Sequence, residues 1–230
     1  MRTAPSDRPA HHIIGMPGPC RLYMVRHGTT RMNVQNRYRG RCDVPLDAQG
    51  YQDAVDAARR LSGVGLAAVY TGPLRRTIAT ANVIADEAGV PDIRILHGLI
   101  NLDYGAWEGM TSAEASAHDA RAFELYTASP QRAFCPDGEK LSVAQDRIIA
   151  ALRLIGERHR DEAVCAVTHA VMIRLVIARL VDLGGEKWRV EIDRGGVTEF
   201  EVDGDDIRLV TPIRTGNVAE DNFPAVAAGG

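Results

Sequence analysis

Short apolar runs alternate with longer amphipathic segments along the central part of the chain. The apolar runs predict buried strands at residues 20–25, 66–71, 93–96 and 163–168. Apolar residues three and four positions apart predict helices at 47–62, 73–88, 111–127, 138–159 and 171–181. Strands and helices that alternate in this way indicate an α/β fold, with a mostly parallel central sheet and helices on both of its faces.

Local signals refine some of these elements. Pro73 follows a predicted strand and Gly72, so we expect it in the first turn of a helix, where the missing N–H is tolerated. The pattern of the helix at 47–62 places Tyr51 on its buried side, together with Ala54, Ala58 and Leu61. Residues 195–212 alternate apolar and polar side chains around a turn sequence, which predicts a C-terminal hairpin at the edge of the sheet.

The two ends of the chain lack such patterns. Residues 1–19 contain four prolines and show no apolar period, so we expect a flexible leader there and a flexible tail at 218–230. Residues 20–217 are then a single domain, which at this length can bury a proper core.

Composition narrows the class of protein. With 45% hydrophobic and 25% charged residues and a formal charge of −3, the chain is typical of a globular protein and does not indicate a nucleic-acid partner. It shows neither a membrane-spanning run nor a signal peptide, so we expect a cytoplasmic protein with no membrane partner. The four cysteines are scattered without metal-ligand spacing, so we expect reduced thiols and no metal site.

Candidate chemistry gathers where predicted strands end. One strand runs into Arg26-His27-Gly28 and another runs into His169. Because ligand sites in parallel sheets form beyond the carboxyl ends of the strands, both histidines are expected to face one pocket. A third strand leads to Arg75 and Arg76 in the first turn of a helix, where free amides and guanidinium groups suit an anion.

Each of these residues has an ordinary structural alternative. A single histidine at a strand end is most often a hydrogen-bonded structural residue, and arginines at a helix start are usually solvated. The joint pattern, with Gly28 permitting the close approach of a ligand, favours the binding of a phosphoryl group.

Six segments match a known family in order. They are "LYMVRHGTTRMN", "RYRGRCDVPLDAQG", "TGPLRRTIATA", "LDYGAWEGMTSAE", "PDGEKL" and "AVTHAVMIRL". Together they resemble the motifs of the histidine phosphatase superfamily, in its phosphoglycerate-mutase-like branch with small phosphatases. The resemblance implies the α/β fold of that branch and a phosphatase that requires no metal or other cofactor.

The resemblance also implies roles for individual residues. His27 is the nucleophile that forms a phosphohistidine, while Arg26, Arg76 and His169 hold the phosphate oxygens. Arg76 is preferred to Arg75 because of its place in "RRTIATA". The remaining substrate contacts are expected from Thr30, Asn33, Arg37, Asn101 and Glu108. The chemistry is consistent, because neighbouring cations keep an imidazole neutral and therefore nucleophilic.

The general acid of the family departs from its usual pattern here. The expected carboxyl position, four residues before Gly105, is occupied by Asn101, which cannot donate a proton as an acid does. Asp103 or Glu108 could supply the proton, with a slight preference for Asp103 because Glu108 belongs to a turn that is commonly structural. Alternatively, the substrate has a leaving group that needs little protonation, or the chain only binds a phosphorylated ligand.

These observations predict a phosphomonoesterase that hydrolyses a small phosphorylated metabolite, such as a sugar, nucleotide or cofactor-precursor phosphate. A phosphoglycerate-mutase-like phosphotransferase is the alternative enzyme, although residues 109–135 leave little room for the insertion that mutases carry. A catalytically degenerate binding protein is the third alternative. The sequence leaves the oligomeric state open, with a homodimer as one candidate.

Overall fold

The computed structural model describes residues 17–128, 132–182 and 189–216. The tail expected at 218–230 and most of the leader lie outside these residues. The last residues of the expected leader contact the rest of the chain: Arg160 donates to the Pro17 carbonyl at 2.8 Å, and the Gly18 amide donates to the Asp161 carboxylate at 2.7 Å.

A six-stranded sheet forms the centre of the described chain, with the order β3-β2-β4-β1-β5-β6. The strands are β1 Cys20–Arg26, β2 Leu66–Thr71, β3 Ile93–Ile95, β4 Ala163–Thr168, β5 Val197–Asp203 and β6 Asp206–Leu209. The first four strands run parallel to one another, whereas β5 pairs antiparallel with both β1 and β6. The prediction of a mostly parallel sheet with a C-terminal edge hairpin is therefore confirmed.

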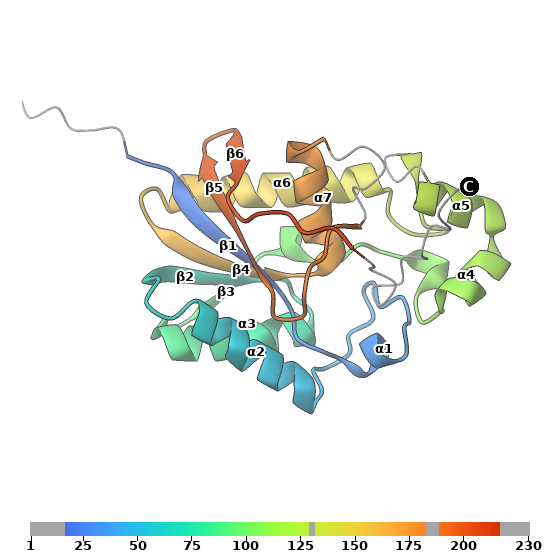
Figure 1. Ribbon diagram of the computed structural model, residues 1–230, viewed down its shortest axis with the longest axis horizontal. Coiled ribbons are helices and arrows are strands. Elements are labelled where there is room, and N and C mark those ends of the chain that lie inside the picture. The colour runs from blue at the N-terminus through green and yellow to red at the C-terminus, as the bar shows by residue number, and fades with distance from the viewer. Residues whose placement is uncertain (1–16, 129–131, 183–188, 217–230) are drawn as a thin grey trace, which may run out of the picture.

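Helices cover both faces of this sheet. They are α1 Arg31–Val34, α2 Ala48–Arg60, α3 Arg75–Ala88, α4 Ser112–His118, α5 Ala120–Ala128, α6 Leu141–Arg158 and α7 Ala170–Leu180. Figure 1 shows α2 and α3 on one side of the sheet and α6 and α7 on the other, with α4 and α5 set beyond its end. Short 3-10 turns span His97–Leu99 and Gly105–Trp107.

The alternation of side chains along the strands builds two cores. In β1, Leu22 and Met24 pack in the core on the side of α6 and α7, whereas Tyr23 and Val25 pack in the core on the side of α2 and α3. All six residues of β4 are buried, because the strand lies inside the sheet between the two helical layers. Burial on both faces explains why these strands are continuous apolar runs in the sequence.

Three details of the predicted helices are wrong. Helix α3 begins at Arg75 rather than Pro73, because Leu74 keeps an extended backbone and is the N-cap residue. The single helix expected at 111–127 is interrupted at Asp119, whose carboxylate accepts from the Ala122 amide and starts α5. Tyr51 is 52% exposed, because the buried side of α2 is made by Gly50 and small alanines instead.

Candidate active site

Two histidines meet where β1 and β4 end. Arg26 pairs with Thr168 in the parallel register, so the next residue of each strand, His27 and His169, leaves the sheet at the same edge. The His27 amide donates to the Thr168 carbonyl at 3.0 Å, which fixes the start of this loop. The two rings are almost completely buried, and their centroids are 5.1 Å apart. The structure therefore brings together the two histidines that the sequence placed at separate strand ends.

One hydrogen bond defines the tautomer of His27. Its Nδ1 lies 2.6 Å from the carbonyl oxygen of Gly28, which can only accept, so Nδ1 carries the proton and Nε2 keeps its lone pair. Burial lowers the pKa of His27 well below its usual value, and the nearby charges of Arg76, Arg39 and Arg26 lower it further. The ring is therefore neutral at pH 7, with an unprotonated Nε2.

His169 lies beside His27 at the N-terminus of α7. Neither of its ring nitrogens has a hydrogen-bond partner among the described residues, and it makes no capping bond to its own helix. Burial is the main cause that lowers its pKa well below the usual value, followed by Arg76 and His27. The free amides of the first turn of α7 add positive potential at this point.

Arg76 reaches the same region from the start of α3. It is fully buried, and its two Nη atoms donate to the carbonyls of Cys42 and Gly40 at 2.7 and 2.8 Å. Its Nε has no hydrogen-bond partner among the described residues. Arg75 is instead exposed, with its backbone amide bound to Asp43, so the structure supports the choice of Arg76 over Arg75.

Arg26 is the second arginine of this cluster, and its position is set by the loop that precedes β5. Its Nη1 donates to the Ile192 carbonyl at 2.5 Å, and its backbone pairs with Gly195 and Gly196. Thr30 and Asn33 lie nearby in sequence and bind each other, because the amide and hydroxyl of Thr30 both donate to Asn33 Oδ1. The Nδ2 of Asn33 is buried without a partner among the described residues. Such a buried donor is stabilised by any oxyanion that reaches it.

Arg37 binds groups other than these residues, and Arg39 joins the cluster. Arg37 is partly exposed and binds the Gly109 carbonyl at 2.6 Å and the Glu114 carboxylate at 2.9 Å. Arg39 is only 9% exposed, and its charge lowers the pKa values of both histidines. Sequence reasoning missed Arg39, although the alternation of arginines in "RYRG" directly before Gly40 is a signal that could have found it.

The three candidates around the expected proton donor are all held by other groups. Asn101 is buried, donates to the Gly40 carbonyl at 3.1 Å and accepts from the Leu102 amide at 3.0 Å. Asp103 accepts from the Gly105 amide at 2.9 Å and lies 3.0 Å from Arg41.

Glu108, the last of these candidates, accepts from the Arg41 amide at 2.6 Å and from the Cys42 thiol at 3.3 Å. Neither Asp103 nor Glu108 is among the groups that contribute most to the lowered pKa values of the two histidines.

The reason for Gly28 differs from the one expected. A Cβ at this position would lie 2.1 Å from the carbonyl oxygen of Gly50 in α2. The missing side chain therefore lets α2 pack against the loop that carries His27, rather than clearing a path for a ligand. The close packing of α2 fixes the backbone on which the nucleophile sits.

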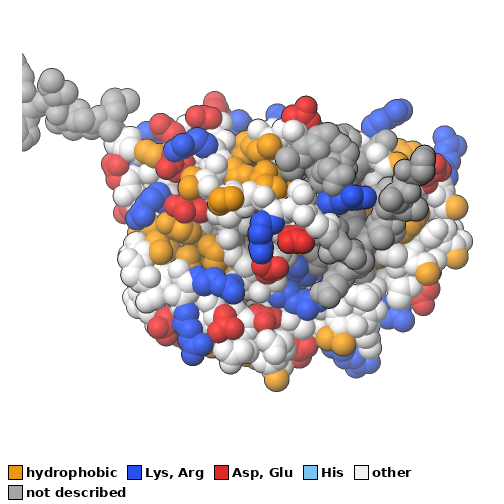
Figure 2. Space-filling view, viewed as in Figure 1, with side chains coloured by type: hydrophobic (Ala, Val, Ile, Leu, Met, Phe, Trp, Pro, Cys, Tyr) orange, Lys and Arg blue, Asp and Glu red, His pale blue; other side chains and the backbone are white. Residues whose placement is uncertain are grey.

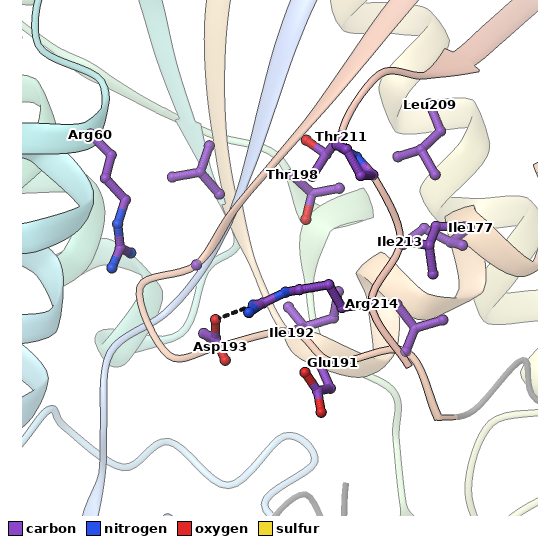
Figure 3. Close-up of a pocket in the computed structure, with 14 residues that line it drawn as sticks. Arg60, Ile177, Glu191, Ile192, Asp193, Thr198, Leu209, Thr211, Ile213 and Arg214 are labelled. Atoms are coloured by element: carbon purple, nitrogen blue, oxygen red, sulfur yellow. Dashed lines mark hydrogen bonds and ion pairs between the residues drawn. The ribbon is translucent and has the colours of Figure 1, made fainter. Parts of the chain in front are cut away.

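A separate cavity of about 260 Å³ lies against the loop that holds Arg26. Figure 3 shows its lining, which includes the ion pair between Arg214 and Asp193 and the side chain of Ile192. None of the predicted site residues lines it. The cavity therefore adjoins the site through this loop but is not the place where the histidines meet.

The described residues contain no group of three or more His, Cys, Asp or Glu side chains placed to hold a metal ion. No helix in the described ranges is both long and apolar enough to cross a membrane. The four cysteines are all free thiols. Figure 2 shows acidic and basic side chains interspersed over the face in view, rather than gathered by sign.

The buried histidines predict how stability depends on pH. The unfolded chain protonates His27 and His169 near pH 6.5, whereas the folded chain resists protonation, so stability is lost as the pH falls below this value. Below pH 6.5, each histidine lowers the free energy of unfolding by about 1.4 kcal/mol per pH unit. The melting temperature of the free chain should fall between pH 7 and pH 5.5. In His169→Gln this fall should be smaller. Equal pH dependence in His169→Gln and the parent chain would contradict this.

Comparison with known proteins identifies the family. The family model of the histidine phosphatase superfamily (branch 1) matches residues 22–214, which include both histidines and all three buried arginines of the cluster. The chain belongs to the histidine phosphatase superfamily.

This histidine phosphatase superfamily member matches some relatives over most of their length and others over only about half. The chain is 32% identical over 197 residues to the bifunctional protein Rv2228c of Mycobacterium tuberculosis, covering 84% of this chain and 54% of that protein. It is 27% identical over 176 residues to the adenosylcobalamin/alpha-ribazole phosphatase of Escherichia coli, covering 76% and 86%. The chain thus spans about half the length of the mycobacterial relative.

Solved structures confirm the fold of this histidine phosphatase superfamily member. Bacillus stearothermophilus YhfR superposes with a TM-score of 0.74 at 34% sequence identity, covering 83% of this chain and 95% of that one. The family match and this superposition confirm both the resemblance seen in the sequence motifs and the predicted fold class.

Proposed function

We propose that the chain is a phosphomonoesterase that hydrolyses a small phosphorylated metabolite through a phosphohistidine on His27. The observation that carries this proposal is the state of the His27 ring: Nδ1 is held by the Gly28 carbonyl, and Nε2 is unprotonated among buried arginines. A neutral imidazole among cations is suited to attack a phosphoryl group that those cations attract.

The reaction follows from these positions. Arg26, Arg76 and His169 bind the phosphate oxygens, and the Nδ2 of Asn33 adds a further donor. The lone pair of His27 Nε2 attacks phosphorus, and the bond to the leaving oxygen breaks with its electron pair on that oxygen. Water then attacks phosphorus, the P–N bond breaks, and phosphate leaves with both hydrogens of the water. Positioning and charge supply most of the rate, so the reaction requires no metal.

The named relatives agree with a small phosphorylated substrate. The E. coli relative is an adenosylcobalamin/alpha-ribazole phosphatase, which supports the choice of a sugar, nucleotide or cofactor-precursor phosphate as substrate. Asn101 in the place of the usual acid also favours a second candidate function, in which the chain binds a phosphorylated ligand without turnover.

Rapid quench distinguishes hydrolysis from binding. The chain is mixed with 4-nitrophenyl phosphate in the presence of EDTA, quenched in alkali, and analysed by peptide mass spectrometry. We expect nitrophenol release together with a phosphate group on the peptide that contains His27. If no phosphopeptide forms from this compound or from a panel of sugar phosphates, nucleotides and acyl phosphates that bind, the chain is a binding protein. Formation of 2-phosphoglycerate from 3-phosphoglycerate would support the phosphotransferase instead.

A further inference from the structure

Among the described residues, the charges that most affect the pKa values of the two histidines belong to arginines and, for His169, to the ring of His27. Arg76 and Arg39 act on both rings, Arg26 acts on His27, and Arg147 acts on His169. Transfer to His27 leaves negative charge on the departing oxygen, which must be either protonated or stabilised by a cation. These four arginines can supply the cation, whereas no proton donor has yet been identified.

Other groups engage the two carboxylates that are candidates for the acid. Both oxygens of Asp103 are engaged, one by the Gly105 amide and the other by Arg41. Both oxygens of Glu108 accept as well, from the Arg41 amide and from the Cys42 thiol. Asn101, at the expected acid position, has no acidic proton and binds backbone groups on both sides. Each of these side chains supports the shape of the loop at Gly40–Cys42.

Arg39 directly precedes Gly40, the first residue of this loop. Hydrogen bonds hold the chain on both sides of Arg39. The carbonyl of Gly40 accepts from both Arg76 and Asn101, at 2.8 and 3.1 Å. On the other side of Arg39, Tyr38 is buried and exchanges two backbone hydrogen bonds with Gly109 and Met110. The ring of Tyr38 packs against Tyr104, Trp107 and Tyr126.

The position of Asn101 links this loop to the missing acid. The amide that replaces the acid donates to the carbonyl of Gly40, directly after Arg39, so Asn101 and the segment that carries Arg39 are in contact through one backbone group. Arg39 is 9% exposed and is held between Tyr38 and Gly40. Arg39 therefore adds a buried positive charge next to the position at which the acid is expected.

We propose that Arg39 stabilises a leaving group that departs as an oxyanion, so that the preferred substrates are phosphoanhydrides or acyl phosphates rather than alkyl phosphates. This inference rests on the proposed function, because it concerns the first step of the same reaction. It narrows the substrate from phosphate esters in general to phosphorylated metabolites whose leaving group is itself a phosphate or a carboxylate. The bond from His27 Nε2 to phosphorus forms while the bond to the leaving oxygen breaks. The electron pair stays on that oxygen, which leaves as phosphate or carboxylate without accepting a proton.

Substituted phenyl phosphates test the proposal, because the pKa of the leaving phenol can be varied at constant size. We expect kcat/KM to fall steeply as this pKa rises, since no acid assists departure. Pyrophosphate and acetyl phosphate then test the two leaving groups, phosphate and carboxylate, against glycerol phosphate. A general acid typically accelerates a reaction by about 10²–10⁴-fold. The kcat/KM for pyrophosphate or for acetyl phosphate should therefore exceed that for glycerol phosphate by about this factor. A shallow dependence, or glycerol phosphate as the best substrate, would overturn the proposal.

Variants assign the effect to Arg39. Arg39→Gln should make the dependence on leaving-group pKa steeper and Arg39→Lys should partly restore it, because the charge is kept. Arg75→Gln is the matched control, since this exposed arginine should change neither rate nor slope. If Arg39→Gln lowers kcat/KM equally for every phenyl phosphate, Arg39 binds only the transferred group and the proposal is wrong.

Two further variants test whether a carboxyl group acts as an acid. Asn101→Glu should raise kcat/KM for glycerol phosphate by about 10-fold or more and flatten the dependence on leaving-group pKa. Asp103→Asn, introduced into the parent sequence without the Asn101 change, should leave the dependence of kcat/KM on leaving-group pKa unchanged. If the parent slope is shallow and steepens in Asp103→Asn, that carboxyl is the acid, and the proposal fails while the phosphohistidine on His27 still forms. Absence of the phosphohistidine with every substrate would instead reject the proposed function.

Discussion

Replacing His27 with alanine is expected to lower kcat/KM for 4-nitrophenyl phosphate by at least about 10⁴-fold. The ring provides the only nucleophile in the proposed reaction, and its Nε2 is kept unprotonated by burial and by the arginines around it. The neighbouring ring of His169 binds the phosphate oxygens in the proposed reaction and does not form the phosphohistidine. Steady-state rates measured with the purified variant, corrected for the uncatalysed reaction, give the loss directly.

Two other variants make the His27 result specific. His118→Ala removes an exposed histidine at the end of α4 and should keep full activity. His27→Asn places an amide nitrogen at the position of Nδ1 and can still donate to the Gly28 carbonyl, so it preserves this buried contact if alanine destabilises the fold. If either His27 variant folds and retains a tenth of the parent activity, the nucleophile lies elsewhere.

The sequence predicted the sheet well because burial on both faces leaves a strong local signal. β1, β2 and β4 are short apolar runs with buried patterns, and their observed bounds differ from the predicted ones by at most one residue. The helix boundaries were less accurate, because they depend on single contacts. The bond from the Asp119 carboxylate to the Ala122 amide divides one predicted helix into two, and no apolar period encodes such a contact.

Some residues of the candidate site could likewise be predicted from local sequence signals, and others could not. His27 and His169 could be predicted together because neighbouring parallel strands must end at the same edge of the sheet. Arg39 was missed, because apart from the alternation of arginines in "RYRG" its loop has no period and is placed by distant groups, among them Arg76 on α3 and Asn101 before the second 3-10 turn. Arg37, two residues earlier, was chosen from the motif resemblance, but the structure pairs it with Glu114 on α4.

Replacing Arg76 with glutamine is expected to lower kcat/KM by about 10²–10³-fold, the cost typical of losing one donor to a developing charge. Burial lowers the pKa of Arg76 to about 10, which still leaves the guanidinium charged at pH 7. The same group donates to the Gly40 and Cys42 carbonyls, so glutamine should also reduce the free energy of unfolding, by about 1–3 kcal/mol. Steady-state kinetics and denaturant unfolding measure the two effects separately.

Arg76→Lys and Arg75→Gln separate charge from geometry. Lysine keeps the positive charge but cannot bind both carbonyls while directing an N–H toward the phosphate, so its activity should lie between those of the parent and Arg76→Gln. Arg75 is exposed at the same helix start, and Arg75→Gln should match the parent in rate and stability. An Arg76→Gln variant that loses stability but keeps its full kcat/KM would show that Arg76 only supports the loop. Because that loop also carries Arg39, a normal dependence on leaving-group pKa in Arg76→Gln would show that Arg39 keeps its place without this support.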